Sequence, residues 1–412
     1  MSTPSADSLP TPVDADVSFL PLLIANFAMV AGTYAFVTIA GPMVRRMQLA
    51  PLHVGAIIGI VGLVWMVAAP RWGRAADIRG RLPTMRAAIG GFVASSLLLA
   101  GYVGWSLRGG SSTVPPVWAG FIALLATRAA MGACYAGLPV AATAWIADRT
   151  PVTGRAAAIA RFGAAGAVGM VLAPPLAGWL AGFDMMLALA VFALLPLAGL
   201  TGLRRLRDDG VHAARQAPPR LSPTDPRLRL PWCSAFALYS AVMIANSVLG
   251  FYVIDRLHVR TSDASMVVGY ALGSAGVGLI AMQALVGRLR AVSPLQWLRW
   301  GALAAGAGFV SVLISGAAHP LLLCASYFVA AAGMGAAFPA VAALASVRVE
   351  PPEQAACAGA MSMAQGLSMV VAPLAGMLLY ELHPAVPFAS IGAVLAIVFV
   401  ATCRRPSPAP PA

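Results

Sequence analysis

Residues 71–86 read RWGRAADIRGRLPTMR, and they place a dense positive charge between two long apolar runs. Five arginines stand in this stretch against a single acid, Asp77. Gly73 and Gly80 permit a tight turn, so we expect a short loop between two helices. A loop this basic between two membrane-length segments is expected to stay on the cytoplasmic side of the bilayer.

The rest of the chain is too apolar for a water-soluble protein. Of its 412 residues, 60% are hydrophobic and 10% are charged, whereas soluble domains carry about 25% charged residues. A helix needs about 20 apolar residues to cross a bilayer, and runs of that kind recur along the whole chain. We therefore predict an all-α integral membrane protein with twelve transmembrane helices at residues 19–43, 52–70, 83–106, 117–147, 155–182, 185–203, 231–254, 264–286, 295–316, 320–346, 355–380 and 385–403.

A polar break rich in arginine and proline divides the predicted helices into six and six. The sequence MVLAPPLAG at 170–178 is echoed by MVVAPLAG at 369–376, so we expect two halves related by a pseudo-twofold axis. We expect the protein to lie in the cell inner (plasma) membrane with both termini in the cytoplasm, because most arginines then fall in cytoplasmic loops. Arg45 and Arg46 are exceptions, since they fall on the outer side. The predicted order is a cytoplasmic tail (1–18), a six-helix bundle (19–203), a cytoplasmic linker (204–230), a second six-helix bundle (231–403) and a cytoplasmic tail (404–412).

The pattern Gly73-x-x-x-Asp77-x-x-Gly80-Arg81 resembles the loop between helices two and three of the major facilitator superfamily, a group of secondary transporters. The charged residues Asp148 and Arg155 follow the fourth span, and Glu350 and Glu353 hold the matching place after the tenth. The resemblance implies a network of ion pairs that would lock the two halves together at the inner face. The candidate residues for gating and coupling are Gly73, Asp77, Gly80, Arg81, Arg128, Asp148 and Arg155.

The fifth span carries a second resemblance. Gly169-x-x-x-Ala173-Pro174-x-x-Ala177-Gly178 is similar to the antiporter motif of the same superfamily, which implies export driven by proton entry. Gly169, Pro174 and Gly178 are its candidate residues. The alternative is a kinked packing helix, because small residues at this spacing let any two membrane helices approach closely.

Arg128 lies deep in the fourth span, where a charge is costly and is expected to face an interior cavity. Arg128-x-x-x-Gly132 resembles the superfamily's span-four motif, whose arginine is linked to proton transfer. The alternative is an arginine satisfied by carbonyl groups and tyrosines such as Tyr135. Other polar side chains inside spans could line the cavity or bond a neighbouring helix; these are Asn26, Tyr34, Tyr239, Asn246, Gln283 and Gln365.

The resemblance implies proton-coupled export of a small organic molecule, either a drug or a metabolite such as a siderophore. No carboxylate lies deep in a predicted span, so a neutral or anionic substrate suits the chain better than a cation. A proton-coupled uptake symporter for a small nutrient or a metal chelate remains the alternative. An enzyme is not expected, because the five histidines lie in or beside loops and share no motif.

The expected partners are the substrate, protons and the lipid bilayer. The net charge of +13 is explained by loop arginines, so nucleic acid is not expected. Scattered cysteines without metal-ligand spacing predict neither a metal nor a cofactor site, and we expect a monomer.

Overall fold

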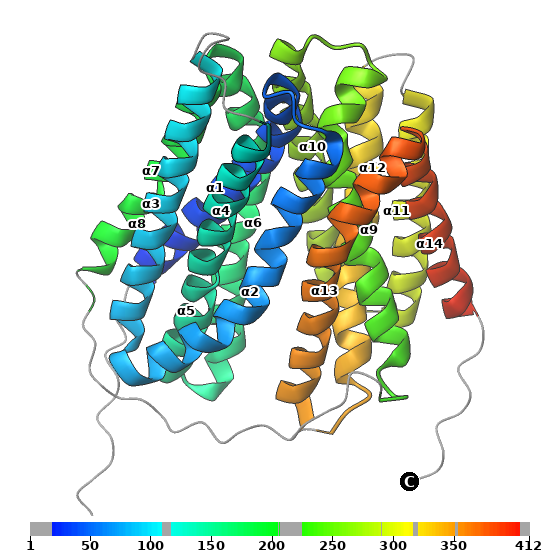
Figure 1. The fold of residues 1–412 in the computed structure, drawn as a ribbon. Coiled ribbons are helices and arrows are strands. Elements are labelled where there is room, and N and C mark those ends of the chain that lie inside the picture. The colour runs from blue at the N-terminus through cyan, green and yellow to red at the C-terminus, as the bar shows by residue number, and fades with distance from the viewer. Residues whose placement is uncertain are drawn as a thin grey trace, which may run out of the picture.

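The computed structural model describes residues 19–108, 117–204, 206, 225–289, 291–315, 320–350 and 353–403. The predicted tails at 1–18 and 404–412, and most of the predicted linker at 204–230, lie outside these residues. Within them, twelve helical spans are long and apolar enough to cross a membrane, as the sequence predicts. The chain is therefore a multi-pass membrane protein (Figure 1).

The first half contains eight helical segments that form six spans. Two spans expected to be continuous are each broken once, because a proline lacks the N–H group that would bond the carbonyl four residues earlier. Pro139 follows the break at Ala136, and Pro196 follows the break at Leu195. The segments are α1 (Leu20–Arg46), α2 (Pro51–Arg79), α3 (Arg81–Arg108), α4 (Val117–Tyr135), α5 (Gly137–Arg149), α6 (Val152–Phe183), α7 (Met185–Leu194) and α8 (Pro196–Leu203).

The second half contains six spans, each a single helix. Proline lies inside two of them, Pro339 and Pro373, and neither helix is interrupted there. The helices are α9 (Arg229–Asp255), α10 (Thr261–Arg288), α11 (Pro294–Ser315), α12 (Pro320–Ser346), α13 (Gln354–Leu382) and α14 (Val386–Cys403).

The most extensive contacts between the halves are those of α2 with α13 and of α6 with α10. A Cβ atom added to Gly55 of α2 would lie 2.8 Å from the carbonyl oxygen of Pro373, and one on Gly269 of α10 would lie 2.4 Å from that of Pro174. Only glycine allows backbones to come this close. The contacting glycines have the same spacing in both pairs: Gly55, Gly59 and Gly62 in α2, and Gly269, Gly273 and Gly276 in α10. The equivalent interfaces agree with the predicted pseudo-twofold relation.

The two ends of the molecule are called the basic face, after its arginine-rich turns, and the opposite face. The basic face holds the α2–α3 turn at Gly80 and the α5–α6 turn at Thr150, and the opposite face holds the ends of α1 and α9. The halves meet in the part of the molecule near the opposite face. Both α2 and α10 begin at that face, and the glycines that contact the other half lie in the first part of each helix. Gly41 and Gly250 also meet there: a Cβ atom on Gly41 would lie 2.7 Å from the Cα atom of Gly250.

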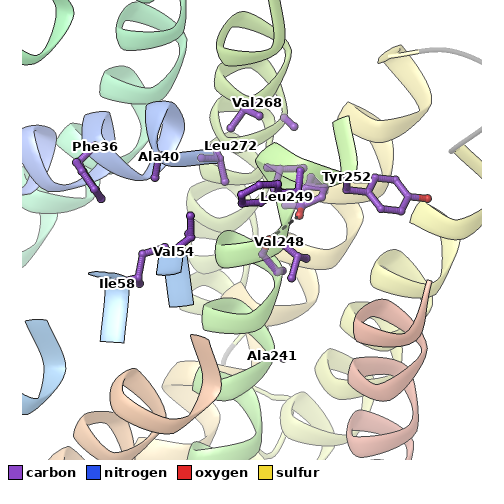
Figure 2. Close-up of a cluster of buried hydrophobic side chains, with 14 of the residues drawn as sticks. Phe36, Ala40, Val54, Ile58, Ala241, Val248, Leu249, Tyr252, Val268 and Leu272 are labelled. Carbon is purple, nitrogen blue, oxygen red and sulfur yellow. Dashed lines mark hydrogen bonds between the residues drawn. The ribbon is translucent and has the colours of Figure 1, made fainter. Parts of the chain in front are cut away.

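A single hydrophobic core extends across both halves at this depth. Phe36 of α1 and Ile58 of α2 belong to the same buried cluster as Leu249 of α9 and Leu272 of α10. Figure 2 shows these side chains in one region of the molecule. Close packing of this kind holds the halves together on the side of the opposite face.

Candidate functional site

Arg81 is the centre of an ion-pair network on the basic face. Gly80 adopts a positive φ of 96°, which ends α2 and lets α3 begin at the next residue. Arg81 therefore contacts Asp77 one turn earlier and donates through Nε to Oδ2 of Asp148 at 3.2 Å. The Arg81 and Asp148 side chains are 5% and 13% exposed, whereas that of Asp77 is 64% exposed. The network thus fastens the ends of α2, α3 and α5 within the first half.

Two residues predicted to belong to this network lie elsewhere. Gly73 is inside α2 rather than in a turn, because the helix continues to Arg79 and the turn needs Gly80 alone. Arg155 donates through Nη2 to the carbonyl oxygen of Ala147 at 2.7 Å. It therefore binds an end carbonyl of α5 instead of Asp148.

The second half has a separate network on the basic face. Arg227, just before α9, pairs with Asp225 at 2.9 Å and with Glu353, just before α13, at 3.0 Å. Charge-assisted hydrogen bonds from Arg227 hold the pKa of both carboxyl groups below their usual values. Both basic-face networks stay inside one half, so the expected lock between the halves is not formed here by these described residues.

An ion pair across the halves lies at the opposite face. Arg45, at the end of α1, pairs with Asp255 at the end of α9, and the Tyr380 hydroxyl donates to Asp255 Oδ2 at 2.9 Å. The Arg45 guanidinium also lies 5.2 Å from the ring centroid of Phe251. This contact accounts for an arginine that the loop-charge rule leaves unexplained. The sequence positions of the two residues could have indicated this pair. Arg45 lies at the end of the first span of the first half, and Asp255 lies at the end of the first span of the second half.

The residues of the antiporter-like segment lie on two faces of α6. Gly169 packs on α1 of its own half, where an added Cβ atom would lie 2.5 Å from the carbonyl oxygen of Phe27. Pro174 and Gly178 face α10 of the other half, and a Cβ atom on Gly178 would lie 2.3 Å from the carbonyl oxygen of Ser265. The segment is therefore part of the contact that closes the molecule near the opposite face.

A cavity of about 240 Å³ lies mainly in the second half. Only Tyr34 of α1 and Met170 of α6 represent the first half among the described lining residues. A smaller cavity of about 100 Å³ shares Tyr239, Phe338 and Gln365 with it, and adds residues near the starts of α9 and α13. Because both helices start on the basic face, the two cavities together extend toward that face.

Four of the six polar side chains proposed from the sequence line this cavity, namely Tyr34, Tyr239, Asn246 and Gln365. Asn26 does not, because it faces α6 and donates through Nδ2 to the carbonyl oxygen of Phe162 at 2.7 Å. Gln283 does not either, because it is exposed near the end of α10.

Aromatic lining residues were missed by the sequence reading. Tyr327 and Phe338 of α12 both line the cavity, together with Met334. Spacings of seven and four residues place these three side chains on one face of a helix, and this periodicity could have identified them. Tyr239 stacks on Phe338 with ring centroids 4.7 Å apart.

Arg128 is 2% exposed and does not line either cavity. Its guanidinium lies 4.0 Å from the ring centroid of Phe36, and Nη1 is 3.0 Å from the Met131 sulfur atom. Its Nε atom has no hydrogen-bond partner among the described residues. Among the described residues, neither a carboxylate nor Tyr135 is hydrogen-bonded to Arg128. The face of the Phe36 ring is therefore its main electrostatic contact.

Comparison with known proteins extends these observations. The chain is 28% identical over 373 residues to the tetracycline resistance protein, class G, of Vibrio anguillarum, covering 86% of this chain and 88% of that one. The fold is similar to that of a bacterial homologue of the human lysosomal transporter Spinster, solved in an inward-facing and occupied conformation. That match has a TM-score of 0.72 and 16% identity over 95% of this chain and 98% of the other.

A POT family transporter in complex with a thioalcohol-conjugated peptide is also similar. It matches with a TM-score of 0.73 and 12% identity, over 93% of this chain and 95% of the other. The family model described as Major Facilitator Superfamily matches residues 22–313 and 231–412. Twelve spans, two related halves and this match lead to one conclusion: the chain is a membrane transporter that belongs to the Major Facilitator Superfamily.

Proposed function

We propose that this transporter exports a small organic molecule in exchange for protons, by alternating access. The observation that carries the proposal is the position of Pro174 and Gly178, which lie in the contact between α6 and α10 near the opposite face. An antiporter-like segment at this place can seal the cavity while its other side is accessible. The 28% identity to a tetracycline resistance protein supports export, and makes tetracycline the first compound to test.

In the proposed cycle, the protein lies in the inner membrane. Its basic face and both of its termini point toward the cytoplasm. Asp77, Gly80, Arg81 and Asp148 fix the ends of α2, α3 and α5, and therefore move as one unit when the inner gate closes. Arg155 supports this unit through the end of α5. The substrate enters the cavity from the basic face, and separation of α6 from α10 then releases it on the other side.

The outer gate is proposed at the opposite face. Among the described residues, the carboxylate that pairs across the halves is Asp255, which is bound to Arg45 and Tyr380. Release of the Arg45–Asp255 pair would remove an attraction between the halves. The halves would then separate at this face, which is the movement that an exporter needs after loading from the cytoplasm.

The test uses inside-out membrane vesicles with an acid interior and labelled tetracycline outside. We expect accumulation that stops when a protonophore collapses the gradient. Accumulation that ignores the gradient would end the proton hypothesis. Gradient-driven accumulation in right-side-out vesicles alone would favour the uptake symporter for a small nutrient or a metal chelate. If tetracycline is not moved, the same assay is run with compounds that accumulate in cells lacking the gene.

A further inference from the structure

The cavity is lined mainly by apolar and aromatic groups. Five aromatic rings line it, from Tyr34, Tyr239, Phe309, Tyr327 and Phe338. Of the described residues that line it, none carries a charge. An apolar wall with a few polar groups selects a ligand by shape and by hydrogen bonds.

Two amide side chains of the cavity wall, Asn246 and Gln365, are free to bind a ligand. Neither the Asn246 nor the Gln365 side chain has a hydrogen-bond partner among the described residues. Tyr327 differs, because its hydroxyl already donates to the carbonyl oxygen of Ala245 at 3.3 Å. An amide side chain offers both a donor and an acceptor, so these two residues complement neutral amide, carbonyl or hydroxyl groups.

The aromatic rings alone would also suit a cation, because ring faces attract positive charge. The cavity wall argues against a cation. None of its described residues is a carboxylate, so a cation would lose water without a countercharge. An anion would likewise lack a partner, because Arg128 lies against Phe36 and is not among the described lining residues.

We propose that the cavity binds uncharged aromatic molecules that carry an amide-like hydrogen-bonding group, with Tyr239 and Phe338 holding the ring and Asn246 and Gln365 holding the polar group. The proposal names the substrate class for the transport function proposed above, and it rests on that function only for its physiological meaning. Binding affinity then resides mainly in the second half of the molecule, whereas the Arg81 network and Arg128 lie in the first.

The test is equilibrium binding to the full-length protein in lipid nanodiscs, with three probes that share one ring system: 2-naphthamide, 2-naphthoate and 2-naphthylmethylammonium. We expect the amide to bind about tenfold more tightly than either ion, because each ion must leave water without a countercharge. Tyr239→Ala should weaken binding of the amide. Equal or tighter binding of either ion, or the absence of saturable binding of the amide, would overturn the proposal.

A matched pair of variants tests the position of the site. Gln365→Glu places a carboxylate in the cavity wall and should raise the affinity for the ammonium probe about tenfold relative to the amide. Gln283→Glu makes the same chemical change at an exposed place outside the cavity, and should leave the preference unchanged. If the two variants behave alike, the cavity is not the binding site.

Failure of this proposal is separable from failure of the transport proposal. Preference for the amide without gradient-driven transport would leave the cavity assignment standing and remove proton-coupled export. Gradient-driven export of cations, with no binding of the amide, would support proton-coupled export and remove the cavity assignment.

Discussion

Arg81 contacts two carboxylates that differ in their exposure to water. The Asp148 side chain is 13% exposed and that of Asp77 is 64% exposed, whereas Arg81 itself is almost completely buried. Water screens an exposed ion pair strongly and a buried one weakly. The two carboxylates therefore contribute unequally to stability, although the sequence motif contains only Asp77.

We predict that Asp148→Asn destabilises the protein more than Asp77→Asn. Loss of Asp148 leaves the buried Arg81 guanidinium short of a partner and should cost about 1–3 kcal/mol. The exposed pair with Asp77 should contribute only ~0–1 kcal/mol. Thermal unfolding of both variants in the same detergent gives the comparison, and an equal or larger loss for Asp77→Asn would contradict it.

The Arg227 network should depend on pH. Arg227 lowers the pKa of Asp225 and Glu353, so these carboxylates stabilise the folded state above their unfolded pKa values. This contribution is lost as the pH falls through the folded-state pKa values, which lie below the usual values of the two carboxyl groups. Arg227→Ala should therefore unfold at a lower temperature than wild type at pH 7, and the difference should shrink as the pH is lowered toward 4 and below. A constant difference across this range would be evidence against the network.

At the scale of the helix, α6 has two kinds of glycine. Gly178 touches the backbone of α10 in the other half, whereas a Cβ atom on Gly182, one turn later, would meet nothing within 4 Å. The same residue type therefore serves a contact between halves at one position and faces the surroundings of the protein at the other. Sequence spacing does not distinguish these cases, because the rotation of the helix about its axis decides them.

We predict that Gly178→Ala disturbs the closed opposite face and that Gly182→Ala does not. The new methyl group of Gly178→Ala would lie 2.3 Å from the carbonyl oxygen of Ser265, so the two helices must separate. Overpacking of this kind costs about 1–3 kcal/mol. Gly182→Ala should change stability by less than about 0.5 kcal/mol, as surface substitutions do. Unfolding temperature and transport rate are the measurements, and similar behaviour of the two variants would refute the assignment.

At the scale of the whole molecule, the halves are fastened on one side. The joined helix pairs, the common core and the Arg45–Asp255 pair all lie toward the opposite face. On the basic face, the two ion-pair networks described each stay within their own half. The cavity is thus closed toward one face and extends toward the other, which is the arrangement that alternating access requires.

We predict that Arg45→Ala opens the opposite face. A Tyr34→Cys reporter in a variant without the native cysteines should react faster with an impermeant maleimide added on that side, because Asp255 has lost its partner in the first half. Arg108→Ala is the matched control, since Arg108 pairs with Asp184 at the same face but within one half. No increase with Arg45→Ala, or an equal increase with both variants, would remove the pair from the gate.

Much of the fold could be read from the sequence because the bilayer restricts it. Backbone groups in lipid must bond within their own helix, so apolar runs of sufficient length become spans, and basic turns mark one face. The repeat near Pro174 and Pro373 likewise indicates two related halves. These features depend on residues near one another in the chain, and the turn at Gly80 with its Asp77–Arg81 contact belongs with them.

The rest depends on which helices lie together and on how each is rotated. The pairing of Arg45 with Asp255, the absence of Asn26 and Gln283 from the cavity, and the contact of Arg128 with Phe36 each join or separate residues far apart in the chain. Every helix here is apolar on most of its surface, since lipid and protein interior select similar side chains. Hydropathy therefore locates the spans and leaves their facing surfaces undetermined, and only the tertiary packing selects the groups that meet in the cavity and at the gate.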